Sequence, residues 1–120
     1  MTNFDELGLD ANLVSRVAAL GYETPSPIQE EAIPALVSGR DVVGLAQTGT
    51  GKTAAFALPM IQKIDTTLDE TQALVLAPTR ELALQVCEAI TSYAEGQTLR
   101  VLPVYGGQSY GAQLSGLKRG

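Results

Sequence analysis

The chain has 120 residues, of which 45% are hydrophobic and 18% are charged, a composition typical of a folded domain rather than a disordered chain. Its 13 acidic and 8 basic residues give a net charge of −5, which disfavours a protein that coats nucleic acid through bulk positive charge. The single cysteine and the absence of histidine exclude an internal disulfide, a cysteine-rich zinc site and imidazole catalysis.

The charge is unevenly distributed, because residues 1–31 carry the whole net negative charge and the rest of the chain is balanced. The acidic total therefore does not exclude a local phosphate-binding surface. The amino terminus lacks the basic and apolar regions of a signal peptide, and no apolar run approaches the length of a membrane span. We expect a cytoplasmic chain with no membrane partner.

Two helices are predicted in the first 40 residues. Asp10 is a suitable N-cap, and apolar residues with helical spacing follow it as far as Gly21, which is suited to end a helix. Ser26 and Gln29 then have the spacing of a capping box, with a proline at the first helical position.

Strands and helices alternate in the remainder of the chain. Apolar runs bounded by Gly and Pro predict buried parallel strands, and periodic or capped segments predict helices between them. The strands are expected at 41–46, 73–77 and 100–105, and the helices at 52–63, 80–94 and 109–118. This order predicts an α/β fold, a parallel sheet flanked by helices and built with right-handed crossovers.

A glycine-rich loop between the first strand and its helix has the composition of a phosphate-binding loop. Its residues are Ala46, Gln47, Thr48, Gly49, Thr50, Gly51, Lys52 and Thr53. The glycines let backbone N–H groups curl around a phosphate at a helix amino terminus. Lys52 would reach the β- and γ-phosphates, and the Thr53 hydroxyl would ligate Mg²⁺. The alternative is a glycine-rich turn whose lysine is merely solvated.

Two upstream residues bear on the choice of base. The Gln29 amide can give one hydrogen bond to adenine N7 and take one from N6, a pattern that guanine does not match. Tyr22 offers an aromatic face for stacking. Alternatively, Gln29 serves only the capping box.

Taken together, these segments resemble the amino-terminal lobe of DEAD-box ATP-dependent RNA helicases. The stretch from Gly21 to Gln29 is similar to that family's Q motif, whose glutamine reads adenine, and Phe4 matches the isolated aromatic residue upstream of it. Ala46 is the usual first residue of the phosphate loop in this family. The resemblance implies that Gln29 reads the adenine of ATP, a role compatible with capping, and places Phe4 and Tyr22 in the ATP site.

Two further segments acquire a role through the resemblance. Pro78, Thr79 and Arg80 are similar to the next family motif, and Gly106-Gly107 is similar to the glycine pair that follows it. On their own they read as a strand end with a helix cap and as an ordinary turn. The resemblance implies that they hold RNA phosphates without reading base edges, which is sequence-independent binding.

The resemblance also implies a domain organisation. Residues 1–40 would form a helical amino-terminal extension that carries the Q motif, and residues 41–120 the first part of an incomplete RecA-like P-loop domain. The sequence contains no Asp-Glu-Ala-Asp segment, no Ser-Ala-Thr motif and no arginine finger from a second helicase lobe, a partner that the family requires. We expect these 120 residues alone to bind ATP without hydrolysing it, and to fold marginally.

Two other readings of the residues stay open. The chain could come from another P-loop enzyme, such as a DNA helicase or a nucleotide kinase. It could equally be a non-enzymatic nucleotide-binding module.

Overall fold

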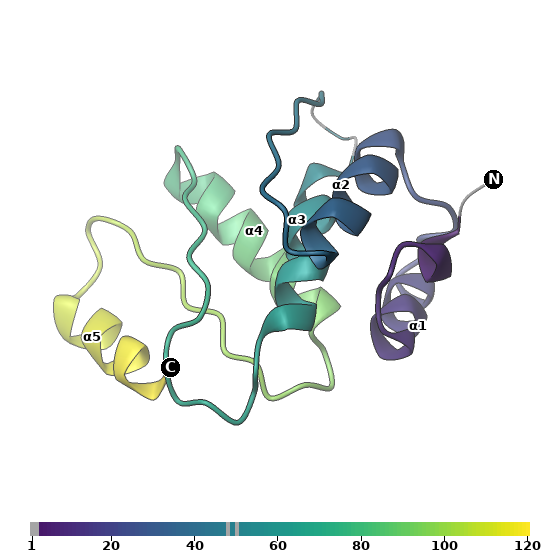
Figure 1. Cartoon of the computed structure of the whole chain (residues 1–120). Helices are drawn as coiled ribbons and strands as arrows, with labels where there is room; N and C mark the ends of the chain where they lie inside the picture. The colour runs from purple at the N-terminus through teal and green to yellow at the C-terminus, as the bar shows by residue number, and fades with distance from the viewer. Residues whose placement is uncertain (1–2, 48, 50) are drawn as a thin grey trace. The chain divides into compact units, whose positions relative to one another are not determined.

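The computed structural model describes residues 3–47, 49 and 51–120, and the regular elements among these residues are helices (Figure 1). The chain divides into two compact units, Met1–Lys63 and Ile64–Gly120, called the amino-terminal unit and the carboxy-terminal unit below. The expected domain boundary at residue 40 stays a prediction.

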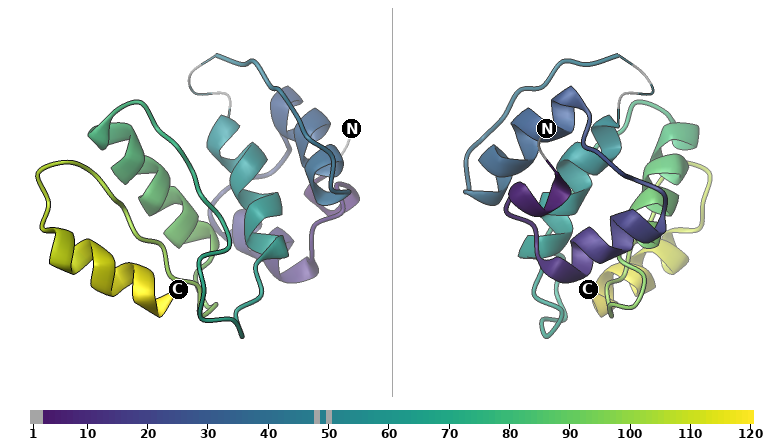
Figure 2. Two further views of the ribbon diagram at one scale, coloured as in Figure 1. Left: turned by 60° about the vertical axis from the view of Figure 1, so that its left-hand side comes forward. Right: turned by 90° about the vertical axis from the view of Figure 1, so that its right-hand side faces the viewer.

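The amino-terminal unit contains a short 3-10 helix, η1 (Phe4–Glu6), and three α-helices: α1 (Ala11–Ala19), α2 (Pro27–Val37) and α3 (Lys52–Lys63). Helices α2 and α3 pack side by side, as both views of Figure 2 show. The apolar core is contributed by all four elements and by the turn after η1; its members include Phe4, Leu7, Leu13, Val17, Ile33, Leu58 and Ile61. The three α-helices lie where the sequence predicts them. For α1 and α2 the signals are local, because each has an N-cap residue at its start and a glycine just after its end.

A side chain from α3 fastens the segment that precedes α1. The Gln62 amide oxygen accepts a hydrogen bond from the Asp10 backbone nitrogen at 2.6 Å, and its nitrogen donates to the Gly8 carbonyl oxygen at 3.0 Å. The backbone between η1 and α1 is thereby held on α3.

The carboxy-terminal unit contains α4 (Arg80–Tyr93) and α5 (Tyr110–Arg119). The chain that follows α4 runs back along it in the opposite direction. Cys87 Sγ lies 3.9 Å from the Val101 carbonyl oxygen, and the Tyr105 ring lies beside Arg80 at the start of the helix. The residues just after Tyr105 are therefore brought close to the amino terminus of α4.

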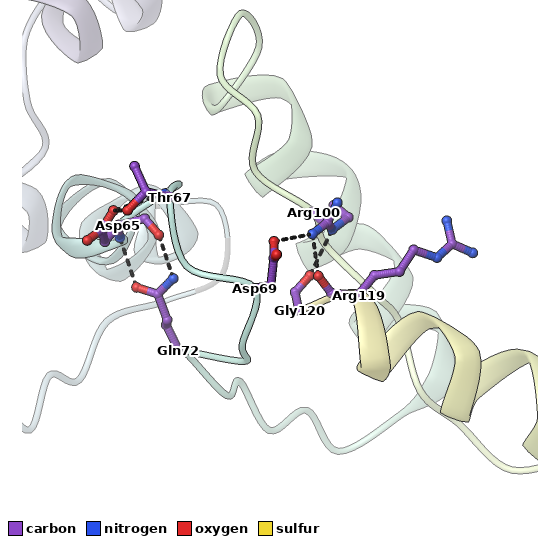
Figure 3. Close-up of polar contacts among 7 residues, drawn as sticks. All are labelled: Asp65, Thr67, Asp69, Gln72, Arg100, Arg119 and Gly120. Carbon is purple, nitrogen blue, oxygen red and sulfur yellow. Dashed lines mark hydrogen bonds and ion pairs between the residues drawn. The ribbon is translucent and has the colours of Figure 1, made fainter.

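Polar contacts fix the connections of this unit (Figure 3). The Gln72 amide oxygen accepts a hydrogen bond from the Asp65 backbone nitrogen, and the Gln72 amide nitrogen donates one to the Asp65 carbonyl oxygen, each at 2.8 Å. Arg100 donates to the carbonyl oxygens of Gly120 and Arg119 and forms an ion pair with Asp69 at 3.5 Å. These contacts are exposed, so each stabilises the unit only slightly.

The expected strands are the main departure from the sequence-based prediction. No residue described by the structure belongs to a strand, and segments 41–46, 73–77 and 100–105 run as irregular chain. The apolar side chains expected in a buried sheet are exposed: Val43 is 94% exposed, Leu45 92%, Leu74 81% and Leu76 86%. The predicted parallel sheet is therefore not confirmed by this structure.

The physical reason is the lack of a pairing partner. A strand is stabilised by hydrogen bonds to a neighbour and does not persist alone. The family resemblance implies that the strand carrying the carboxylate motif lies between the first two predicted strands, and that motif is absent from this sequence. On that implication, segments 41–46 and 73–77 lack the neighbour that would order them.

Candidate functional site

The phosphate loop leads directly into α3. Gly49 and Gly51 both have a φ of 83°, a conformation that favours glycine. The Gly51 carbonyl oxygen accepts a hydrogen bond from the Ala55 backbone nitrogen at 3.1 Å, so α3 begins immediately after Gly51. Lys52 is exposed and Thr53 is half-buried, both in the first turn of α3. Backbone N–H groups in a first turn have no partner within the helix and carry positive partial charge, which suits an anion.

The rest of the predicted loop is only partly described. Ala46 is half-buried and Gln47 is exposed. Thr48 and Thr50, which the sequence also assigns to the phosphate loop, lie outside the described residues.

Gln29 links the start of α2 to this loop. Its side chain is buried, and its amide oxygen accepts a hydrogen bond from the Ser26 backbone nitrogen at 3.0 Å, as the capping box requires. Its amide nitrogen donates to the Gly51 carbonyl oxygen at 3.2 Å. A glutamine amide has two donor hydrogens and two acceptor lone pairs, so one donor and one acceptor position remain. That pair is what adenine N7 and N6 require, so capping and adenine reading are chemically compatible.

The close approach of Gln29 accounts for the glycine at position 51. A Cβ atom on Gly51 would lie 2.2 Å from Gln29 Nε2 and 3.1 Å from its Cδ. At Gly49, which has the same φ, a Cβ would meet nothing within 4 Å. Position 51 is therefore restricted by its neighbour as well as by its backbone.

The two aromatic residues assigned to the ATP site lie against each other. The rings of Phe4 and Tyr22 are stacked, with centroids 6.3 Å apart and an interplanar angle of 29°. Phe4 is buried and Tyr22 is half-buried. In this arrangement Phe4 supports the Tyr22 ring from the core of the unit.

The segments assigned to RNA meet at the start of α4 in the carboxy-terminal unit. Thr79 is the N-cap, and its hydroxyl oxygen accepts a hydrogen bond from the Leu82 backbone nitrogen at 3.1 Å. Arg80 is exposed, and its guanidinium carbon lies over the Tyr105 ring, 4.7 Å from the centroid. Tyr105 directly precedes Gly106-Gly107, which is exposed. Pro78 is exposed beside Thr79, so the structure brings all the predicted RNA residues into one region of one unit.

Sequence analysis assigned no role to Tyr105 or to Gln113, although both shape this region. Gln113, on α5, is buried and its amide nitrogen donates to the Tyr105 carbonyl oxygen and to the Gln108 amide oxygen, each at 2.9 Å. Contacts of this kind join residues that are distant in the sequence. The position of Tyr105 beside a glycine pair was the only local signal.

Other chemistry is sparse in the described part of the chain. It contains no group of three or more His, Cys, Asp or Glu residues able to hold a metal ion. Partial burial raises the pKa of the Cys87 thiol, which favours its neutral form. Among the described helices, none is long and apolar enough to cross a membrane.

Residues 26–120 match the family model for DEAD/DEAH box helicases. The chain is 58% identical over 118 residues to the ATP-dependent RNA helicase DeaD of Mycobacterium tuberculosis, a match that covers 98% of this chain and 21% of that protein. It thus spans about a fifth of the length of the curated relatives that it matches.

Solved structures agree with the sequence matches. A DEAD box protein from Methanococcus jannaschii superposes with a TM-score of 0.94 at 37% identity, over 99% of this chain and 33% of that one. Dbp5 of S. cerevisiae, in a structure bound to RNA and ADP BeF3, gives a TM-score of 0.77 at 39% identity, over 82% of this chain and 26% of that one. The expected RecA-like helicase lobe is therefore confirmed at the level of the fold, whereas its parallel sheet is not.

Proposed function

This chain belongs to the DEAD/DEAH box helicase family, and from that premise we propose that the complete protein is an ATP-dependent RNA helicase that remodels RNA duplexes. The observation that carries the proposal is the hydrogen bond from Gln29 to Gly51. This bond connects the residue whose amide can bind adenine to the loop that can bind phosphate, within one compact unit. The relatives named as ATP-dependent RNA helicases support the same conclusion.

In the proposed ATP site, the start of α3 binds the phosphates. Loop residues 46–53 would supply backbone N–H groups, and the Lys52 ammonium would neutralise the β- and γ-phosphates. The Thr53 hydroxyl would contact Mg²⁺ carried by the nucleotide. One hydroxyl fits this ion, because Mg²⁺ usually keeps several waters and takes few protein ligands beside phosphate oxygens. Bound there, the ion would offset negative charge on the phosphates.

The base would lie against Gln29 and the Phe4–Tyr22 pair. Gln29 would use its remaining amide hydrogen for adenine N7 and its remaining lone pair for adenine N6. Tyr22 would stack on the base, with Phe4 behind it. Because Gln29 also bonds Gly51, adenine binding would order the loop that holds the phosphates.

In the proposed RNA site, the carboxy-terminal unit contacts the phosphate backbone. The donors would be the Thr79 hydroxyl, the Arg80 guanidinium and the backbone N–H groups of Gly106-Gly107. All of these groups can bind phosphate oxygens without contacting a base edge, and used in this way they would make binding independent of sequence. The second helicase lobe of the complete protein would hold the same strand from its own side.

We further propose that segments 41–46, 73–77 and 100–105 join a parallel sheet in the complete protein. The exposed leucines and valines of these segments would then be buried. The 120 residues alone would bind ATP and leave it intact, since the carboxylates that phosphoryl transfer needs are not among them.

The test is RNA-stimulated phosphate release and duplex unwinding by the complete protein. Lys52→Gln should lower the rate of ATP hydrolysis by about 100-fold or more, the usual effect of removing a group that stabilises transition-state charge. Lys63→Gln, at the other end of α3, is the matched control and should behave like the wild type. RNA-stimulated hydrolysis that survives Lys52→Gln would overturn the proposal.

A further inference from the structure

We propose that Tyr105 is a positioning residue, which holds the Arg80 guanidinium at the start of α4 so that it can contact an RNA phosphate. This inference rests on the proposed function and adds to it a residue that the RNA motifs themselves do not contain. Its basis is the position of the Tyr105 ring under Arg80, with 4.7 Å from the guanidinium carbon to the ring centroid.

The backbone course explains why these two side chains meet. The segment after α4 runs antiparallel to the helix, with Val101 beside Cys87 and Tyr105 beside Arg80. One more residue along the segment reaches the glycine pair. The Tyr105 ring therefore contacts one group of proposed phosphate donors, and its backbone directly adjoins the other.

An aromatic ring holds a cation without using an anionic partner. The ring face attracts positive charge through its quadrupole. No carboxylate among the residues described by the structure forms an ion pair with Arg80. The Arg80 side chain is therefore held in place while its positive charge stays unneutralised, which leaves the charge available to bind a phosphate.

Tyr105 is itself held from α5. Buried Gln113 bonds the Tyr105 carbonyl oxygen on one side of Gly106-Gly107 and the Gln108 side chain on the other. The glycine turn is thus clamped at both ends. Since glycine loses the most conformational freedom on ordering, such a clamp reduces the cost of presenting its N–H groups to RNA.

The experiment measures the affinity of the complete protein for single-stranded RNA across a range of salt concentrations. Tyr105→Leu and Tyr105→Ile remove the ring, and having two aliphatic replacements guards against a folding defect in either one. Each should weaken binding by about two- to fivefold, the size of an exposed cation–π contact. Tyr105→Phe keeps the ring and should bind like the wild type. Tyr110→Leu, which alters an 81% exposed tyrosine on α5, is the matched control and should have no effect.

A second readout separates positioning from simple structural support. Arg80→Gln should weaken binding by about tenfold or more and lower the salt dependence by about 0.7 in the slope of log K against log salt, the value for one single-strand phosphate contact. If Tyr105 acts through Arg80, Tyr105→Leu should lower the same slope. When Arg80→Gln is already present, adding Tyr105→Leu should not weaken RNA binding further.

The outcomes distinguish the two proposals. Unchanged binding by Arg80→Gln would overturn the RNA role of Arg80 and with it the positioning role of Tyr105. Weak binding by Arg80→Gln combined with wild-type binding by both aliphatic variants would overturn only the role of Tyr105. Equal losses in Tyr105→Phe and Tyr105→Leu would also overturn it, because the ring would then not be the group that matters.

Discussion

In the amino-terminal unit the central site residue, Gln29, is 5% exposed and is held by hydrogen bonds to Ser26 and Gly51. In the carboxy-terminal unit the corresponding residue, Arg80, is exposed and is held by one ring. The same contrast extends to the cores. Helices α1, α2 and α3 each bury apolar side chains. In the second unit, the buried apolar residues among those described are Ile90, Tyr93 and Ala94.

The difference shows which half of the fold depends on local structure. Three helices that are neighbours in sequence can bury their apolar faces against each other without a sheet. Helices α4 and α5 flank irregular segments whose apolar side chains stay exposed. We infer that the proposed nucleotide site is the better formed of the two in these 120 residues, and that the proposed RNA site gains most from the rest of the complete protein.

The largest expected effect is the difference in stability loss between two leucine-to-alanine variants, one in each unit. Leu58 is fully buried in α3, so Leu58→Ala should destabilise the protein by about 2–5 kcal/mol in both the 120-residue chain and the complete protein. Leu74 is 81% exposed, so Leu74→Ala should change the stability of the 120-residue chain by less than about 0.5 kcal/mol. Denaturant titrations followed by circular dichroism measure both.

The same pair tests the proposed sheet. If segment 73–77 is a buried strand in the complete protein, Leu74→Ala should there cost about 2–5 kcal/mol. An equal and small effect in both contexts would mean that this segment never enters a core.

A smaller effect is expected from alanine in the phosphate loop. Gly51→Ala and Gly49→Ala impose the same backbone strain, about 1–2 kcal/mol, because both positions have a φ of 83°. Only Gly51→Ala should also displace Gln29, and it should therefore lower nucleotide affinity more than Gly49→Ala does. Isothermal titration with ADP measures the difference. Gly51→Ala should also lower the stability more than Gly49→Ala does, because of the clash with Gln29. Adding Gln29→Ala to each variant should remove the clash and reduce this difference in stability. An unchanged difference would contradict the account.

The smallest effect concerns Asp65 in the second unit. The Thr67 hydroxyl and backbone N–H both donate to this carboxylate, at 2.6 and 2.9 Å, and hold its pKa below the ordinary value. A lowered pKa in the folded state stabilises the protein above the unfolded pKa, about 4, and this contribution is lost as the pH falls through the folded pKa. An NMR titration of the carboxyl carbon should show the low pKa. Thr67→Val should raise it, and a pKa at the ordinary value in the wild type would refute the assignment.

Local sequence signals predicted the helices, whereas the predicted sheet is not confirmed. Helix α3 begins and ends at the predicted residues. Thr79 caps α4 as predicted, because an N-cap acts within one turn. A strand depends on a partner elsewhere, so the apolar pattern of residues 73–77 could predict a preference and not a pairing.

The same distinction holds for the candidate site. The loop glycines and Gln29 carry recognisable spacing, and their contact follows from the packing of α2 on α3. The contact of Tyr105 with Arg80 and those of Gln113 have no such signature. Polar pairing between distant positions becomes visible only when the backbone brings them together.

The measurement that tests the central claim most directly is a competition between ADP and GDP for a fluorescent nucleotide in the presence of Mg²⁺. The complete protein should prefer ADP, and Gln29→Ala should lose about 5- to 150-fold of that preference, the range of one two-hydrogen-bond base contact. Gln62→Ala is the matched control, because it also breaks two hydrogen bonds to backbone in the same unit but lies about 15 Å along α3 from the loop. It should keep the preference. Equal binding of both nucleotides by folded wild-type protein, or an unchanged preference in Gln29→Ala, would contradict the account.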